Sequence, residues 1–233
     1  MGMIKENNNN KAKSCGAFSY FKDNKPVELL EYHIKKGLEA IDLFSKRKYY
    51  LLLARQLQCD SEEARKVLYI AYIMHDVGKC IEEYQKGKKS FMGHEFYSAA
   101  VILKSELELD PRLKDIVALT VMLHHHTMPW RISKIDNRPV HICYEGKESV
   151  EKILNERIKL KVNLIEDISY VYDIVSELVS RARDRKLMEG VYALLIPVMV
   201  ADDYAASVRG GNSCLGREAV NVVNIYRSIL EES

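Results

Sequence analysis

The stretch that decides the fold runs from Tyr69 to Lys79 and reads YIAYIMHDVGK. Its first six residues are apolar or aromatic, which predicts a segment buried in a core. His75 and Asp76 follow directly, and burying an imidazole and a carboxylate without partners costs several kcal/mol. The pair can be satisfied by hydrogen bonds at a helix end or by a metal ion, since both side chains are good metal ligands.

Helical periodicity dominates the chain on both sides of this stretch. Apolar residues recur at three- and four-residue steps over residues 26–44, and Pro26 suits a first helical turn. Asp60 precedes a glutamate by three residues, as a capping box requires at a helix start. Asp110 and Pro111 form a cap followed by proline at the first helical position. Because we find no convincing strand and no internal repeat, the predicted fold class is all-α, with a single helical domain.

Length and composition indicate one soluble globular domain: 233 residues, of which 47% are hydrophobic and 29% charged. Residues 1–18 are polar, which predicts a flexible N-terminal tail before a domain over residues 19–233. A net charge of +2 gives no global argument for nucleic-acid binding. We find no apolar run of the roughly 18 residues that a membrane span needs and no signal-peptide core, so we expect a cytoplasmic protein without a membrane partner.

The cysteines do not suggest a disulfide framework. There are five, at positions Cys15, Cys59, Cys80, Cys143 and Cys214. An odd and dispersed set without a C-x-x-C pair is typical of reduced thiols in a cytosolic protein, and it excludes a cysteine zinc site of the usual spacing.

The histidines gather in helical stretches with apolar neighbours, each near a helix end or a core stripe. Six of the seven are of this kind, namely His33, His75, His94, His124, His125 and His126, whereas His141 lies in a predicted loop. Several inward-facing imidazoles together with aspartates suggest a metal site between helices. Their number exceeds the four ligands of one tetrahedral ion, so two ions are expected, an arrangement that recurs in phosphate ester hydrolysis.

Five segments follow one another along the chain in a recognisable order. They are His33, His75-Asp76-x-Gly78-Lys79, Gly93-His94-Glu95-x-x-Ser98-Ala99, His124-His125 and Asp203-x-x-x-Ser207. This order resembles the HD superfamily of metal-dependent phosphohydrolases. More narrowly, it is similar to the stand-alone HD nuclease of CRISPR type I systems. The resemblance spans residues 27–208, which is most of the chain.

The resemblance implies a set of metal ligands. One ion would be held by His33, His75, Asp76 and Asp203, and Asp76 would bridge to a second ion held by His94, His124 and His125. His126 is an alternative to one of the paired histidines, and Asp202 competes with Asp203 because helical periodicity does not separate the two. A ligand set this rich in imidazole favours manganese, iron, cobalt, nickel or zinc over magnesium.

The same resemblance implies a nuclease that cuts single-stranded DNA, or RNA, in antiviral defence, together with a separate helicase subunit and a guide-RNA effector complex. Asp76 and Lys79 would be catalytic, the lysine by neutralising a phosphate oxygen. Candidate contacts to the substrate are Lys86, Lys88, Lys89, Trp130 and Arg131. The alternatives are an HD-type phosphohydrolase of small nucleotides and a metal-stabilised scaffold without activity.

Overall fold

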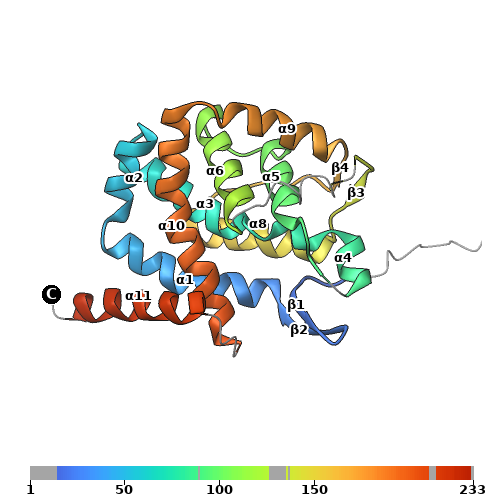
Figure 1. The fold of residues 1–233 in the computed structure, drawn as a ribbon, viewed down its shortest axis with the longest axis horizontal. Coiled ribbons are helices and arrows are strands. Elements are labelled where there is room, and N and C mark those ends of the chain that lie inside the picture. Colours follow the sequence, from blue (N-terminus) through green and yellow to red (C-terminus); the bar gives the residue numbers. More distant parts are fainter. Residues whose placement is uncertain (1–14, 89, 126–134, 136, 210–213, 232–233) are drawn as a thin grey trace, which may run out of the picture.

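The computed structural model describes residues 15–88, 90–125, 135, 137–209 and 214–231, and this part of the chain is mainly helical (Figure 1). It contains ten α-helices and one 3-10 helix, so the predicted all-α class is confirmed. The helices are α1 (Leu30–Lys46), α2 (Tyr49–Leu57), α3 (Ser61–Met74), η1 (Val77–Cys80), α4 (Glu82–Gly87), α5 (His94–Lys104), α6 (Pro111–Leu123), α8 (Tyr144–Ile158), α9 (Val171–Arg181), α10 (Arg185–Val208) and α11 (Cys214–Glu231). The strands are β1 (Phe18–Lys22), β2 (Lys25–Leu29), β3 (Val140–His141) and β4 (Asp167–Ile168).

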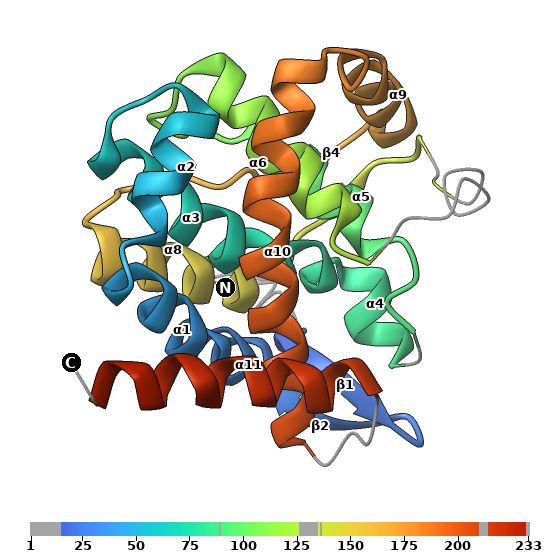
Figure 2. The same cartoon turned by 60° about the vertical axis from the view of Figure 1, so that its left-hand side comes forward.

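Helix α3 forms the centre of the fold. It contacts α1, α2, α6, α8 and α10, which surround it in both views (Figures 1 and 2). Every residue from Val67 to Ile81 is buried, as the apolar run before the histidine predicted. Asp60 begins the helix by accepting the backbone N–H groups of Glu62 at 2.9 Å and Glu63 at 2.8 Å, so the predicted cap is confirmed. The second half of α3 is buried on all sides, which places its C-terminal end deep inside the molecule.

Helix α10 packs along α1 and α6, and α11 lies across its C-terminal end (Figure 2). An 18-residue window of this helix is apolar enough to cross a membrane by length and composition alone, a test that core helices also pass, and here α10 packs against five other helices. A close crossing with α1 depends on Gly37. A Cβ at Gly37 would collide with the Tyr72 hydroxyl and lie 2.6 Å from the Ala201 carbonyl oxygen. Because glycine has no side chain, α1, α3 and α10 can approach one another closely at this position.

Two small antiparallel sheets, β1–β2 and β3–β4, correct the prediction that the chain has no strands. In the first, Asp23 and Asn24 connect the strands with φ values of 52° and 59°, as the two central residues of a type I′ turn require. Pro26 pairs with Phe21 in this hairpin instead of opening a helix, and α1 begins four residues later at Leu30. Local turn chemistry therefore overrides the helical periodicity over residues 26–29.

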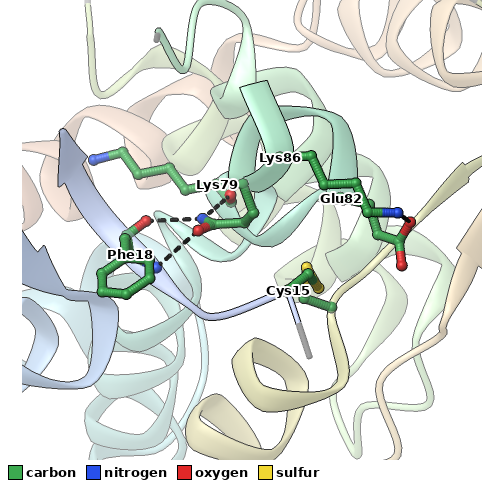
Figure 3. Close-up of a disulfide and its surroundings, with 7 residues drawn as sticks. Cys15, Phe18, Lys79, Glu82 and Lys86 are labelled. Carbon is green, nitrogen blue, oxygen red and sulfur yellow. Dashed lines mark hydrogen bonds and ion pairs between the residues drawn. A yellow bond between two sulfur atoms is a disulfide. The ribbon is translucent and has the colours of Figure 1, made fainter. Parts of the chain in front are cut away.

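The hairpin is tied to the centre of the molecule by a disulfide and by one amide side chain (Figure 3). Cys15 is bonded to Cys143, with a Cα–Cα distance of 5.9 Å. The buried Gln85 accepts the N–H of Phe18 at 3.1 Å and donates to the carbonyl oxygens of Phe18 at 2.9 Å and Lys79 at 2.7 Å. These bonds fix β1 against η1, the 3-10 turn that follows the His-Asp pair.

The prediction of reduced cysteines is therefore wrong for one pair and holds for Cys59, Cys80 and Cys214. The bonded cysteines are 128 residues apart in the sequence, a separation from which pairing cannot be inferred. Residues 15–18, which the sequence analysis assigned to the tail, belong to the folded part, and Ala17 is buried. Residues 1–14 lie outside the described part of the chain.

Candidate metal centre

Seven histidine and aspartate side chains converge where α1, α3, α5, α6 and α10 meet. They form two groups that share one carboxylate, and within each group one ligand atom per residue lies within 4.8 Å of all the others. We call them the first cluster, made of His33, His75, Asp76 and Asp202, and the second cluster, made of Asp76, His94, His124 and His125.

The first cluster joins two imidazoles and two carboxylates around one point. The Nε2 atom of His33 lies 3.0 Å from Asp202 Oδ1 and 3.4 Å from Asp76 Oδ2. The Nε2 atom of His75 lies 3.4 Å from Asp76 Oδ2 and 3.5 Å from Asp202 Oδ1. These four ligand atoms surround one point, so a single ion placed there could bind all four.

The second cluster uses the other oxygen of the shared carboxylate. The Nε2 atoms of His94 and His124 lie 2.9 Å and 3.9 Å from Asp76 Oδ1. The His125 ring lies beside both of these histidines, with centroid distances of 3.9 Å to His124 and 5.0 Å to His94. Because Oδ2 faces the first cluster and Oδ1 the second, Asp76 is placed to bridge two ions.

Three of the histidines are held in the orientation that a ligand needs. The Nδ1 atoms of His75, His94 and His124 lie 2.5–2.6 Å from the backbone carbonyl oxygen of the residue three positions earlier. A carbonyl only accepts, so each Nδ1 carries the proton and each Nε2 presents a lone pair. These three Nε2 atoms and Asp76 Oδ1 are buried without a hydrogen-bond partner. Four orphaned polar atoms at one place are costly in a folded protein, and divalent ions would satisfy them.

Lys79 places a positive charge beside the shared carboxylate of Asp76. Its Nζ atom donates to Asp76 Oδ2 at 2.6 Å, and the residue is buried. Burial would raise the pKa of Asp76, but the charge of Lys79 beside it holds the pKa well below its usual range. The shared carboxylate is therefore ionised, which is the form that binds a metal.

The two histidine motifs of the sequence pack directly on each other through Gly78. Its N–H donates to Ser98 Oγ at 2.8 Å. A Cβ at this position would lie 2.7 Å from Ser98 N and collide with the carbonyl oxygen of His94. Gly78 and Ser98 together therefore set the distance between α5 and the end of α3. The sequence alone did not predict this packing role for Ser98.

A sequence model described as the HD domain matches residues 48–207. The chain belongs to the HD domain family. This confirms the resemblance derived from the motifs, and it makes the chain a member of a family of metal-dependent hydrolases.

Two relatives of this HD domain protein are CRISPR-associated. The chain is 29% identical over 240 residues to the CRISPR-associated endonuclease Cas3-HD of Pyrococcus furiosus, covering 90% of this chain and 98% of that protein. A solved structure of a CRISPR-associated Cas3 HD domain protein from Methanocaldococcus jannaschii superimposes with a TM-score of 0.51. That match covers 73% of this chain and 95% of the other at 24% identity, so it supports the fold.

The structure corrects one candidate ligand of this HD domain. Asp202, and not Asp203, lies in the first cluster. Asp202 follows the buried residues Leu195 and Val191 by seven and eleven positions, so it shares their face of α10. The sequence could not separate the two acids because positions 191–200 are apolar around the whole helix, and only packing shows which face is inside.

The remaining candidates lie away from the clusters or outside the described residues. Lys86 forms an ion pair with Glu82 (Figure 3), and Lys88 is exposed at the end of α4. His141 lies in β3, not in a loop, where it is exposed and paired with Asp167. His126, Lys89, Trp130 and Arg131 belong to the part of the chain that the structure does not describe.

A cavity of about 360 Å³ opens onto the second cluster. Its walls include His94, His125, Lys79, Phe91, Tyr20 and Arg209. The guanidinium of Arg209 lies 4.8 Å from the centroid of the Tyr20 ring, and Lys79 Nζ lies 5.6 Å from that of Phe91. Nothing in the sequence pointed to Tyr20, Phe91 or Arg209. A larger cavity of about 640 Å³, lined by Lys104, Lys114 and Lys161, contains none of the cluster residues.

Proposed function

We propose that this HD domain protein is a nuclease that cuts single-stranded DNA, with single-stranded RNA as the alternative substrate. The observation that carries the proposal is the pair of histidine–aspartate clusters that share Asp76. The chain is also similar, along nearly its whole length, to a protein named as a CRISPR-associated endonuclease. This similarity supports the same function.

The chemistry follows from the two clusters. The two clusters could hold divalent ions, which when bound would acidify a water and orient it toward phosphorus. Within the chain, Asp76 holds the two clusters together, and Lys79 lies between Asp76 and the cavity. An ammonium at that position can neutralise a phosphate oxygen as charge develops on it. Because five of the seven candidate ligands are imidazoles, we expect manganese, iron, cobalt, nickel or zinc in preference to magnesium.

The cavity supports a polynucleotide substrate. Tyr20 with Arg209, and Phe91 with Lys79, place an aromatic ring beside a cation on the cavity wall. Sites for single strands combine stacking surfaces with positive charge, because unpaired bases expose their faces and the backbone is anionic. Tyr20 is 40% exposed, so its ring is available to a base that reaches the cavity.

The biological setting belongs to the same proposal. We place the protein in CRISPR-mediated antiviral defence in the cytoplasm, where a separate helicase subunit and a guide-RNA effector complex would supply the single strand. The support is the similarity to the CRISPR-associated endonuclease of Pyrococcus furiosus.

The test is a cleavage assay with a panel of substrates. The protein is incubated with manganese, nickel or magnesium and with labelled single-stranded DNA, duplex DNA, single-stranded RNA or nucleotides. We expect metal-dependent cutting of single strands, weak cutting of duplex and inhibition by salt, because backbone contacts are electrostatic. Asp76→Ala should abolish cutting, since this residue serves both clusters. Asp167→Ala, which removes an exposed aspartate, is the matched control and should retain full activity.

Three outcomes contradict the proposal. Full activity of Asp76→Ala would exclude the two clusters as the active site. Turnover of nucleotides with polynucleotides left intact would make the protein a small-molecule phosphohydrolase. Tight metal binding without turnover of any substrate would favour a scaffold that only docks onto a larger complex.

A further inference from the structure

Strand β2 buries its only glutamate and exposes its apolar neighbours. Glu28 is 5% exposed, whereas Val27 and Leu29 on either side are 54% and 53% exposed. A strand on a protein surface normally turns its apolar residues inward and its charges outward. Positions at which a sequence breaks such a rule are often functional. The question is therefore what the buried carboxylate does.

Glu28 lies against a histidine of the first cluster. Its Oε2 atom is 3.2 Å from His33 Nδ1, the ring nitrogen that faces away from the cluster. The same oxygen accepts a hydrogen bond from Arg209 Nη1 at 2.8 Å and another from the Ser19 hydroxyl. One carboxylate thus connects β1, β2, α1 and the residue after α10 behind a candidate metal ligand.

His33 differs from the other three histidines in what lies beside its Nδ1 atom. The Nδ1 atoms of His75, His94 and His124 lie 2.5–2.6 Å from the carbonyl oxygen three residues earlier. His33 is the fourth residue of α1, and the atom beside its Nδ1 is the carboxylate oxygen of Glu28. Glu28 is therefore in position to orient the ring from outside the helix.

We propose that Glu28 is a positioning residue that acts through His33 Nδ1 to aim His33 Nε2 at the ion of the first cluster. A carboxylate behind a ligating histidine fixes its tautomer and makes the imidazole a stronger donor to the metal. Arg209 and Ser19 hold the carboxylate in place and offset its buried charge. This inference rests on metal binding by the first cluster and not on the identity of the substrate.

The test compares metal affinities of the two clusters separately. Manganese binding is measured by titration calorimetry in two backgrounds, His124→Ala to leave the first cluster and Asp202→Asn to leave the second. Glu28→Gln keeps the shape of the side chain and removes its charge. We expect about a 10–100-fold loss of affinity at the first cluster, the usual effect of removing such a partner, and no change at the second. Glu31→Gln is the matched control, because Glu31 is three residues away and pairs with the exposed Lys35.

Cobalt spectra separate a positioning role from a structural one. Substitution of Glu28 should shift the visible bands of cobalt in the first cluster, since the donor strength of His33 changes, whereas a purely structural role would lower the melting temperature of the metal-free protein and leave these bands in place. Ser19→Ala, a milder change to the same network, should shift affinity in the same direction by less. Equal losses at both clusters, or unchanged affinity at the first, would overturn the proposal, whether or not the protein cuts nucleic acid.

Discussion

The first and second clusters share Asp76 and most of their residue types, but their surroundings differ. The first has a second carboxylate, Asp202, and Glu28 behind it. Burial lowers the pKa of His33, but the facing carboxylates of Asp202 and Glu28 outweigh burial and raise it to about 9. The second cluster is rich in imidazoles, and burial above all lowers the pKa of His125 to about 4. Without metal at neutral pH, His33 is therefore protonated and His125 is neutral.

The difference predicts that the two clusters, although they share Asp76, would bind metal differently. An ion entering the first cluster must displace the proton of His33, whereas His125 is already in its ligand form. His94 and His125 also line the cavity, while His33 and His75 are fully buried. The first cluster is thus the enclosed site, and an ion in the second would be the one that meets a substrate.

The largest expected effect comes from the two adjacent acids of α10. Asp202→Asn removes a carboxylate that faces His33 and His75, so we expect metal binding at the first cluster to be lost and binding at the second to be retained. Asp203→Asn is the matched control with the same change one position along the helix. Calorimetric titration of manganese should therefore give one bound ion for the first variant and two for the second. The reverse pattern would restore Asp203 as the ligand.

The next effect is the release of a proton when metal binds, which we expect at His33 of the first cluster. Because His33 has to lose its proton, manganese affinity there should rise about tenfold per pH unit as pH increases toward 9. Titrations in buffers of different ionisation enthalpy should show about one proton released at pH 7. His125 of the second cluster should release no proton at pH 7, because its pKa is lowered to about 4. Equal proton release at both clusters would remove the distinction between them.

The same pKa shifts predict the pH dependence of stability in the metal-free protein. A raised pKa at His33 contributes stability that is complete below about 6.5 and is lost as pH rises through about 9. A lowered pKa at His125 contributes stability that is complete above about 6.5 and is lost as pH falls toward 4. Melting temperatures without metal should therefore fall on both sides of about pH 6.5, and saturating metal should suppress the fall on the alkaline side.

The smallest expected effect on metal binding comes from the disulfide. Cys15→Ser frees the hairpin that carries Glu28, so we expect a few-fold loss of affinity at the first cluster only. The free energy of unfolding should fall by about 2–4 kcal/mol, because the bond joins residues 128 positions apart. Cys214→Ser, at an exposed free cysteine, is the control and should change neither quantity. Identical melting curves with and without a thiol reductant would show that the tether contributes nothing.

The sequence by itself determined the helical class, the buried stretch and the kinds of residues that meet at its end. An apolar run before His75 indicates burial because moving apolar surface out of water is favourable. Asp60 and Asp110 mark helix starts because their side chains accept backbone N–H groups of nearby residues. The motif order also brought out His33, His94, His124 and His125, all of which the structure places beside Asp76. Their binding of metal stays a prediction that the titrations above test.

Only the tertiary structure decided which side chains support that arrangement. Asp202 is distinguished from Asp203 by the face of α10 that packs inward, and every side of that helix is apolar in the sequence. The hairpin, the Cys15–Cys143 bond and the contact of Arg209 with Glu28 join segments far apart in the chain. Local patterns encode bonds between neighbouring residues, whereas these contacts depend on where the helices stop and how closely they cross, which is settled only when the whole core packs.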